Sequence, residues 1–400
     1  MKPACLKLSK KNREGRNAMK TEVSIMQDYG KQKLLEYADS LRELADSFQS
    51  IISFDYRENE DKLKQMEQVE QNHIFAKQIK DLSNVIDTIA KEKRRVEPLS
   101  EKRYIQIAKE LRGEGIYMRD FVFVYGEDYR QCSMEVRAKR SGITIDDLAG
   151  FMSVLLNIRL QPQRNNDFFI SGDWQNYILV EEPPYHILTG LAKATKQGEM
   201  ISGDSCQCFE YGEGQMAILL SDGVGAGEDA YESSITVVEM MQRLLTAGFS
   251  VESSAQMING FLMTDGTKQS TLDFCNIDLY RGTCRFCKVG AAPSFLKRDH
   301  LVEQLSSRNL PLGLLEDAEA ESASRMLLDG DYIIMLSDGV LDALHNGLGE
   351  SALSEIVSKF RARNPNELAN DILSFVLHQC KGQINDDMTV AAIGFWERAR

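Results

Sequence analysis

Long apolar runs, histidines and paired cysteines are scarce in this 400-residue sequence, and each absence excludes a class of protein. No window approaches eighteen uninterrupted apolar residues, so no membrane-spanning helix is expected. The basic N-terminus has no apolar stretch behind it, so no signal peptide is expected. The eight cysteines are scattered, which is typical of reduced thiols rather than of a disulfide framework. These absences predict a soluble, cytoplasmic protein, or the cytoplasmic part of a membrane protein.

Charge and metal-binding side chains narrow the classes further. The formal net charge of -13 argues against a nucleic-acid-binding protein. None of the five histidines has a metal-ligand spacing to another, and for His186, a candidate general acid, a structural role is favoured. Cys284 and Cys287 form a single C-x-x-C pair. Because no second pair lies nearby, core packing is favoured over a zinc or redox site.

The first quarter of the chain predicts helices. Residues 1–20 are basic and polar and indicate a flexible arm. Residues 21–98 predict a helical regulatory or dimerisation segment, because apolar side chains recur at spacings of three and four. These side chains are Leu34, Ala38, Leu41, Ala45, Phe48 and Ile52, followed by Phe75, Ile79, Leu82, Ile86 and Ile89. An antiparallel helix pair and a homodimeric coiled coil both fit this pattern.

Residues 99–164 predict a small mixed α/β regulatory region. A helix is expected near 101–112, and strands are expected at 116–125 and 132–138. Thr144 is expected to cap a second helix, because acidic residues follow it in the first turn. Nothing in this region carries obvious chemistry.

Residues 165–400 combine many short strand-type runs with grouped helices, which indicates an α+β layered fold rather than strict βαβ alternation. The expected strands are 168–170, 177–180, 186–195, 207–211, 216–220, 272–278, 285–289, 294–297, 332–336 and 388–393. The expected helices are 228–247, 251–263 and 350–379. Gly248 is expected to end the first of these helices and Ser250 to cap the next.

Two segments of the larger domain echo each other. Residues 217–223 and 333–339 are both buried-type strands that end in Ser-Asp-Gly. A carboxylate at the end of a rigid strand, followed by a glycine that permits a sharp turn, directs oxygen ligands into a cleft. The acidic turns at 201–205 and 385–390 fit the same plan. The four aspartates are Asp204, Asp222, Asp338 and Asp386.

Four aspartates that converge in one pocket predict bound cations, because their carboxylates otherwise repel one another and take up protons. Oxygen-only ligands suit magnesium or manganese rather than zinc. Two such ions are able to hold a water molecule that attacks a phosphorus in line. A single aspartate is more simply a turn former or a helix cap, and this interpretation is kept for Asp273 and Asp278.

A glycine-rich turn at 221–227 follows a strand and precedes a helix, which is also the setting of a dinucleotide-binding loop. The spacing is G-x-G-x-G rather than G-x-G-x-x-G. No strand with an acidic end follows about twenty residues later. A site for the phosphates of a metal-dependent enzyme is therefore favoured over a dinucleotide site.

The ordered motifs of residues 170–395 resemble the phosphatase domain of the stage II sporulation protein E family, one of the PPM (type 2C-like) metal-dependent serine/threonine phosphatases. The matching segments are 180–196, 202–205, 221–227, 288–297, 309–313, 337–339 and 386–389. The resemblance implies a PPM-type α/β/β/α sandwich at 165–400, with two manganese (Mn²⁺) or magnesium (Mg²⁺) ions between its sheets. It also implies that the helices at 228–263 form the pair through which regulatory domains control the metal site.

The resemblance assigns roles to individual residues. It implies that Asp222 bridges both metals and acts with Asp204 in catalysis. The implied ligand set is Asp204, Asp222, Gly223 through its carbonyl, Asp338 and Asp386. Asp387 stands where eukaryotic members have asparagine and is a secondary candidate. No arginine matches the phosphate-binding one of eukaryotic members, and Lys193 and Lys196 are candidates to replace it.

The resemblance also implies a function. The expected substrate is phosphoserine on an anti-sigma-factor antagonist, whose release activates a sporulation sigma factor. A general stress-response phosphatase of the same chemistry is the first alternative. A non-catalytic metal-binding interaction module is the second, and retention of all four aspartates disfavours it. The family's membrane-embedded N-terminal region has no counterpart in this sequence.

Overall fold

The computed structural model describes most of the chain. The described residues are 34–46, 62–91, 95–164, 166–265, 269–306, 309–314, 321–345, 350–361 and 363–399. The chain divides into two compact units: Met1–Glu92 with Ala247–Ser253, and Lys93–Thr246 with Ser254–Arg400. No helix in the described ranges is both long and apolar enough to cross a membrane. The predictions for residues 1–20, and for Phe48 and Ile52, fall outside these ranges.

In the first unit, a helix at 34–46 and helix α2 (Lys62–Lys91) meet through small side chains. The fully or almost fully buried positions are Ala38, Ala45, Ala76, Ser83 and Ala90. Ser83 Oγ donates a hydrogen bond of 2.6 Å to the carbonyl of Ala38. The stripe predicted on α2 was therefore wrong at Leu82 and Ile89, which are exposed. Small side chains one position further along allow the two helices to approach closely.

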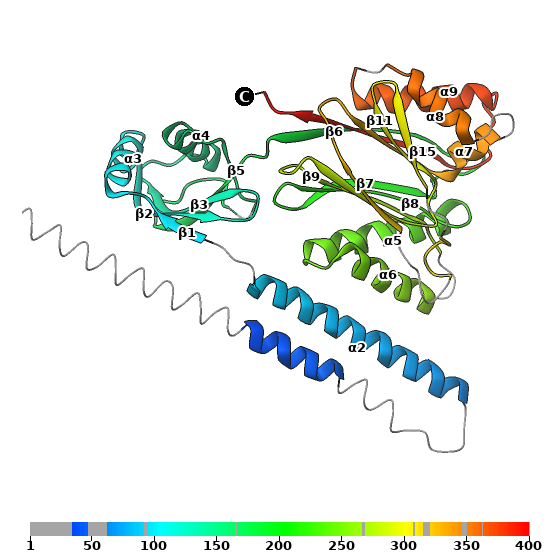
Figure 1. The fold of residues 1–400 in the computed structure, drawn as a ribbon, viewed down its shortest axis with the longest axis horizontal. Helices are drawn as coiled ribbons and strands as arrows, with labels where there is room; N and C mark the ends of the chain where they lie inside the picture. Colours follow the sequence, from blue (N-terminus) through cyan, green and yellow to red (C-terminus); the bar gives the residue numbers. More distant parts are fainter. Residues whose placement is uncertain are drawn as a thin grey trace, which may run out of the picture. The chain divides into compact units, whose positions relative to one another are not determined.

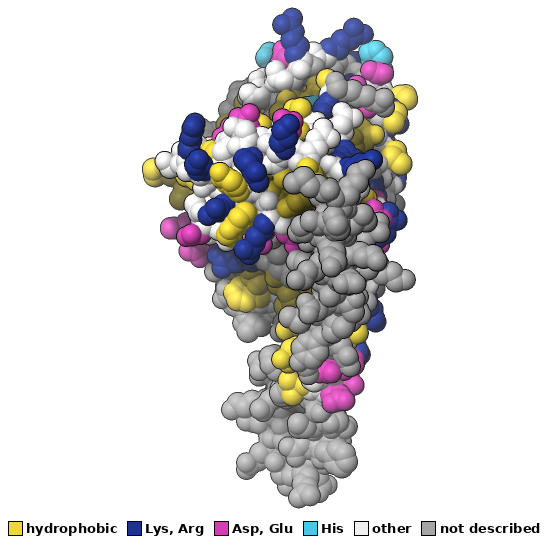
Figure 2. Space-filling model, turned by 90° about the vertical axis from the view of Figure 1, so that its left-hand side faces the viewer, with side chains coloured by type: hydrophobic (Ala, Val, Ile, Leu, Met, Phe, Trp, Pro, Cys, Tyr) yellow, Lys and Arg dark blue, Asp and Glu magenta, His cyan; other side chains and the backbone are white. Residues whose placement is uncertain are grey.

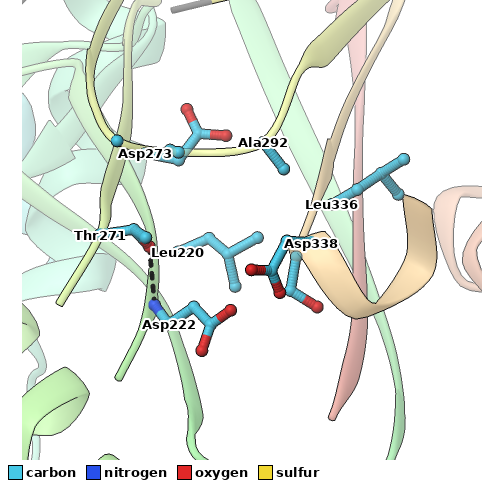
Figure 3. A pocket seen from close by; sticks show the side chains of 10 residues that line it. Leu220, Asp222, Thr271, Asp273, Ala292, Leu336 and Asp338 are labelled. Atoms are coloured by element: carbon cyan, nitrogen blue, oxygen red, sulfur yellow. Dashed lines mark hydrogen bonds between the residues drawn. The ribbon is translucent and has the colours of Figure 1, made fainter. Parts of the chain in front are cut away.

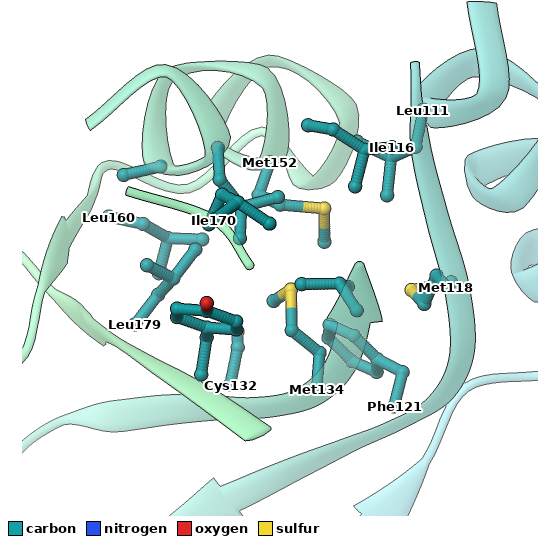
Figure 4. Close-up of a cluster of buried hydrophobic side chains, with 14 of the residues drawn as sticks. Leu111, Ile116, Met118, Phe121, Cys132, Met134, Met152, Leu160, Ile170 and Leu179 are labelled. Atoms are coloured by element: carbon teal, nitrogen blue, oxygen red, sulfur yellow. The ribbon is translucent and has the colours of Figure 1, made fainter. Parts of the chain in front are cut away.

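The second unit begins with a small region in which two helices cover one face of a five-stranded antiparallel sheet (Figure 1). The strand order is β1-β2-β3-β5-β4. The strands are β1 (Arg95–Pro98), β2 (Ile116–Tyr125), β3 (Arg130–Ala138), β4 (Leu160–Pro162) and β5 (Gln175–Glu181); the helices are α3 (Glu101–Gly113) and α4 (Ile145–Leu156). Figure 4 shows the core between them, where Met134 and Phe121 of the sheet lie near Met152 of α4.

Two local predictions for this region meet different outcomes. Thr144 caps α4 as predicted, because its side chain accepts from Asp147 N at 3.1 Å and the Asp147 carboxylate accepts from Thr144 N. The segment 168–170 forms an isolated bridge rather than the predicted strand. Strand β5 lies beyond residue 164 and pairs with β3, so the sheet of the small region extends to Glu181.

The surface of the small region carries basic and aromatic side chains. The guanidinium groups of Arg119 and Arg137 lie 5.1 and 5.0 Å from the ring centre of Trp174, as in cation–π contacts. Figure 2 views the side on which α3 lies in Figure 1, and it shows lysine and arginine side chains gathered around hydrophobic ones. The acidic balance of the chain is therefore not spread evenly over its surface.

The rest of the second unit is a sandwich of two five-stranded antiparallel sheets, with helices on both outer faces (Figure 1). The first sheet has the order β13-β10-β9-β8-β7 and the second β12-β11-β14-β15-β6. The strands are β6 (Tyr185–Ala194), β7 (Asp204–Gly212), β8 (Gln215–Asp222), β9 (Leu272–Asp278), β10 (Thr283–Val289), β11 (Ser294–Arg298), β12 (Leu301–Leu305), β13 (Glu321–Met326), β14 (Tyr332–Leu336) and β15 (Met388–Glu397). The predicted α/β/β/α sandwich is confirmed.

In the described part of the chain, helices lie on the outer face of each sheet (Figure 1). They are α5 (Gly227–Thr246) and α6 (Val251–Asp265), and then α7 (Asp338–His345), α8 (Glu350–Lys359) and α9 (Pro365–Gln379). Gly248, at φ +93°, follows α5, and Ser250 Oγ accepts from Ser253 N at the start of α6, as predicted. The single helix predicted at 350–379 is two helices, because Asn364 caps a new one that opens with Pro365.

Candidate metal centre

The space between the two sheets is apolar along most of its length and polar at one end. Its apolar part includes Leu220, Cys275, Phe286, Leu296, Met335 and Ala391. Because side chains alternate along a strand, the next side chain that points between the sheets lies two residues away. We consider here the neighbour on the side of the polar end. Those positions are Asp222, Asp273, Lys288, Ser294, Ser337 and Thr389, and every one of them is polar. The sandwich therefore concentrates its inward polar groups at one end.

Asp204 and Asp222 come from neighbouring strands of the first sheet and face each other in the register of β7 and β8. The backbone at Asp222 is held on both sides: its N–H donates to Thr271 Oγ1 at 2.9 Å (Figure 3), and its carbonyl accepts from Ser270 Oγ at 2.7 Å. These bonds fix the strand end from which the Asp222 side chain projects.

Asp338 and Asp386 come from the second sheet. Asp338 follows β14 and is the first residue of α7, and Asp386 lies just before β15. Figure 3 shows Asp338 and Asp222 on opposite sides of one pocket, which Asp273 also lines. The wall of this pocket also includes Gly290, Ala291 and Ala292. The two sheets thus bring carboxylates to a common cleft.

The glycines of the two Ser-Asp-Gly segments serve close packing rather than a left-handed turn. A Cβ atom at Gly223 would lie 1.8 Å from the carbonyl oxygen of Ala230 on α5. A Cβ atom at Gly339 would lie 2.1 Å from the carbonyl oxygen of Asp387. Neither glycine has a positive φ. The predicted reason for these glycines was therefore wrong, because they are required by backbone approaching from a neighbouring segment.

The carboxylates lie in an environment that disfavours their charge. Burial raises the pKa of Asp222 to about 10, and the adjoining Asp338, Asp204 and Asp386 add to the rise. Burial also raises the pKa of Asp204 to about 6, against the opposing effect of nearby hydroxyl groups and Lys193. Both carboxylate oxygens of Asp204 are buried without a hydrogen-bond partner among the described residues. These carboxyl groups therefore retain protons to a higher pH than an ordinary aspartate, unless a cation compensates their charge.

Across the described ranges, no three Asp, Glu, His or Cys side chains are grouped closely enough to hold one metal ion. The carboxylates of the two sheets approach one another, and the Asp222 and Asp338 side chains are near enough to share a proton.

Asp387 has a role that sequence reasoning missed. Its side chain is buried, Oδ1 accepts from Lys196 N at 2.9 Å, and Oδ2 accepts from Gly203 N at 2.8 Å. Asp387 thus ties β15 to the segment that carries Asp204. The Asp-Asp pair alone does not signal this role, because both donors lie almost two hundred residues earlier in the sequence.

The two candidate phosphate-binding lysines are in different surroundings. Lys193 Nζ donates to the carbonyl of Asp204 at 2.8 Å. Lys196 Nζ lies 3.6 Å from Asp386 Oδ1, with 32% of its side chain exposed. Lys193 therefore supports the chain at Asp204, whereas Lys196 is accessible beside one of the carboxylates.

Three other candidates lie outside the cleft. His186 lies opposite Trp396 in the register of β6 with β15. The end of β6 nearest the aspartates is at Lys193, seven residues or roughly 20 Å further along the strand. A general-acid role for His186 is therefore excluded, as the structural preference predicted. Cys284 and Cys287 are buried cysteines on β10. Because side chains three apart on a strand point to opposite faces, they do not share a ligand.

The two aspartates interpreted as turn formers differ. Asp278 Oδ1 accepts from Tyr280 N and Arg281 N at 2.9 and 3.0 Å, as a turn former does. Asp273 is not a turn former. It lies within β9, is 1% exposed, and forms a 2.6 Å ion pair with Lys288. The prediction for Asp273 was wrong because its partner is set by strand pairing, which a single sequence does not display.

Comparisons with known proteins agree with this architecture. Residues 212–396 match the family model of stage II sporulation protein E (SpoIIE). The stage II sporulation protein E of Bacillus subtilis (strain 168) is 34% identical over 212 residues, which is 52% of this chain and 26% of that protein. Phosphoserine phosphatase RsbU of the same strain is 20% identical over 240 residues, covering 58% of this chain and 71% of RsbU.

A solved structure extends the likeness beyond the sandwich. The PP2C phosphatase domain of Bacillus subtilis SpoIIE, solved with a fragment of its regulatory domain, matches with a TM-score of 0.58 and 25% identity. The match covers 86% of this chain and 100% of that structure. Because 86% exceeds the share of the sandwich, the likeness includes part of the preceding region.

The layered fold and these likenesses define the sandwich as a PP2C-type (PPM) phosphatase domain, and the homologues and structural neighbours are PP2C-type serine/threonine phosphatases. Within that class, residues 212–396 of the sandwich match the stage II sporulation protein E family, as the ordered motifs indicated. The chain spans about a quarter of the length of the Bacillus subtilis protein that it matches.

Proposed function

We propose that this domain is a metal-dependent protein phosphatase that hydrolyses phosphoserine on a protein substrate. The observation that carries the proposal is the convergence of carboxylates from two sheets on one cleft, where burial and mutual repulsion raise the pKa of Asp222. Asp204 supports it further, because its two buried oxygens lack hydrogen-bond partners among the described residues. A cation is the simplest group to satisfy all of these atoms.

The donor set fits two Mn²⁺ or Mg²⁺ ions. The residues that hold them are Asp204, Asp222, Asp338 and Asp386, with the carbonyl of Gly223. All of these donors are oxygens, which hard cations prefer. When bound, such ions neutralise the carboxylates and supply an activated water for attack on phosphorus. The chain itself orients the donors: Ser270 and Thr271 hold Asp222, and Asp387 holds the segment that carries Asp204.

Lys196 binds the substrate phosphate in this proposal. Its ammonium group lies beside Asp386 and is partly exposed, so it is able to reach a phosphate that enters the cleft. A lysine supplies a positive charge without the bidentate geometry of an arginine. Lys193 has a different task, because its ammonium group already donates to the carbonyl of Asp204.

The proposed substrate is phosphoserine on an anti-sigma-factor antagonist, and its dephosphorylation activates a sporulation sigma factor. The family of the domain supports this choice. A general stress-response phosphoprotein is the alternative substrate of the same chemistry, supported by the likeness to a phosphoserine phosphatase. A non-catalytic metal-binding interaction module is the other alternative, and the presence of all four aspartates argues against it.

Helix α5 is placed to transmit a regulatory signal. The carbonyl of Ala230 packs against Gly223, and the Ala230 side chain packs against Gly203, beside Asp204. Ser234 Oγ on α5 lies 2.8 Å from Ser205 Oγ on β7. A shift of α5 therefore moves both aspartates of the first sheet. We propose that this is how the helices at 228–263 control assembly of the metal site.

The experiment that tests the function is manganese-dependent phosphate release from a serine-phosphorylated antagonist. We expect Asp222→Asn to lower kcat/KM by roughly a thousandfold, because metal charge stabilisation contributes several kcal/mol. Asp278→Asn is the matched control, since it removes one carboxylate charge at a turn outside the cleft, and it should retain activity. Equal activity of Asp222→Asn and wild type would contradict the site. Binding of the phosphoprotein without turnover by wild type would favour the interaction module.

A further inference from the structure

One buried charged group remains outside the proposed mechanism. The side chains of Lys288, Asp273 and Ser294 form what is here called the inter-sheet charge cluster. Its Asp273 lines the cleft. Lys288 Nζ is 2.6 Å from Asp273 Oδ1 and donates to Ser294 Oγ at 2.8 Å. Ser294 Oγ donates to Asp273 Oδ2 at 2.6 Å. The Lys288 and Asp273 side chains are only 3% and 1% exposed, and Ser294 is fully buried.

The cluster joins the two sheets. Asp273 on β9 and Lys288 on β10 are paired residues of the first sheet, whereas Ser294 is the first residue of β11 in the second sheet. The segment 290–293 crosses between the sheets, so Lys288 and Ser294 stand at its two ends. The hydroxyl of Ser294 therefore closes this crossing with two hydrogen bonds.

The cluster is also close to the proposed metal ligands in both sheets. Asp273 pairs with Leu220, which is two residues before Asp222 on β8. Asp273 lines the same pocket as Asp222 and Asp338 (Figure 3). Ser294 lies on β11, which pairs with β14, the strand that leads to Asp338. Each sheet thus contributes one side of the cluster and one side of the cleft.

Stability alone does not account for this cluster. Replacing a buried ion pair by apolar side chains is often neutral or stabilising, because both charges lose their hydration on burial. The same strands use apolar side chains at the neighbouring inward positions, such as Phe286 and Cys275. At the inward positions of β9 and β10, the charged side chains, Asp273 and Lys288, lie at the end beside the cleft. The pairing also commits the Asp273 carboxylate to Lys288 and Ser294, which keeps it from joining the metal ligands.

We infer that the inter-sheet charge cluster is a positioning device that sets the separation between the metal-binding carboxylates of the two sheets. The inference rests on the proposed metal-dependent function. Outer groups that orient metal ligands usually contribute tenfold to a hundredfold to metal affinity. The members of the cluster are positioning residues, because they bind neither the metal nor the substrate.

The test measures Mn²⁺ binding by isothermal titration calorimetry on the full chain. Ser294→Ala removes the second sheet's contribution and leaves the ion pair of the first sheet intact, so the protein is expected to fold. We expect its Kd for Mn²⁺ to rise about tenfold. Asp273→Asn leaves the buried ammonium of Lys288 without its counter-charge, and we expect both weaker Mn²⁺ binding and a lower Tm.

Cys284→Ala is the matched control. Cys284 faces the same inter-sheet space on β10, at the apolar end. We expect this variant to lower the Tm by about 2–4 °C and to leave the Kd for Mn²⁺ within twofold of wild type. A wild-type Kd in Ser294→Ala, or an equal loss of affinity in Cys284→Ala, would overturn the inference alone. Absence of Mn²⁺ binding by wild type would overturn the proposed function together with it.

Discussion

The small region and the sandwich of the second unit both bury an extensive apolar core, but they treat buried polar groups differently. Among the described residues 95–181, Gln131 is the one buried polar side chain. The sandwich buries many, including the charged side chains of Asp204, Asp273 and Lys288. The small region therefore follows the usual separation of apolar inside from polar outside, and the sandwich departs from it.

The larger number of buried polar side chains in the sandwich shows where the fold tolerates the free-energy cost of burying charge. Burying a charge is unfavourable unless the charge is paired, bound to a metal or neutralised by a proton. In the sandwich, the inward polar residues gather at the end of the inter-sheet space, beside the cleft. Concentrated buried charge of this kind is typical of functional sites. The small region carries no comparable cluster in its described core, which agrees with a supporting or regulatory role.

The contrast between the two regions would be wrong if the small region contributed to the metal site. Met152→Ala in α4 empties a fully buried position and should destabilise the protein by about 3 kcal/mol. Met335→Ala on β14 removes an equally buried methionine, three residues before Asp338. We expect a similar loss of stability in both variants, measured by chemical denaturation. We expect weaker Mn²⁺ binding only in Met335→Ala, because that cavity adjoins the cleft.

A loss of Mn²⁺ affinity in Met152→Ala would contradict this separation and show that the small region and the metal site are coupled. An unchanged Mn²⁺ affinity in both variants would instead show that the inner core of the sandwich does not influence the carboxylates.

The pH dependence of stability sharpens the same contrast. In the metal-free protein, the pKa values of Asp204 and Asp222 are about 6 and about 10, above the ordinary aspartate value of about 3.8. The folded state therefore holds protons that the unfolded state releases as the pH rises. Stability should fall from about pH 4 up to about pH 6 for the proton on Asp204 and up to about pH 10 for the proton on Asp222. The slope is up to about 1.4 kcal/mol per pH unit for each proton retained.

Thermal unfolding in a chelator and in Mn²⁺ measures this effect. We expect the Tm of the metal-free protein to fall with pH and Mn²⁺ to reduce or reverse the slope, because the metal binds the charged carboxylates. Asp222→Asn should flatten the metal-free slope. An identical slope in this variant and in wild type would show that the carboxylate cluster is not the source of the pH dependence.

The sequence predicted the parts of this architecture that local pattern determines. The Ser-Asp-Gly strand ends and the Thr144 cap depend on neighbouring residues, and the structure places them as expected. Strands β12 and β13 escaped prediction because edge strands have weak apolar alternation. The Asp273–Lys288 pair escaped because it depends on the register of β9 with β10. Local chemistry is thus readable from sequence, whereas contacts across strands require the fold.

The smallest expected effect concerns Asp387, which holds the segment that carries Asp204. Asp387→Ala removes the acceptors of Gly203 N and Lys196 N, and each lost hydrogen bond should cost about 1 kcal/mol. The Asp204 segment then loosens, and we expect Mn²⁺ affinity to fall about tenfold. Asp387→Asn keeps one acceptor oxygen and should give an intermediate Kd. Asp371→Ala, on the exposed face of α9, removes an equal charge and serves as the control. If both alanine variants bind Mn²⁺ equally well, the segment of Asp204 is held without Asp387, and the buried carboxylate has only a structural role.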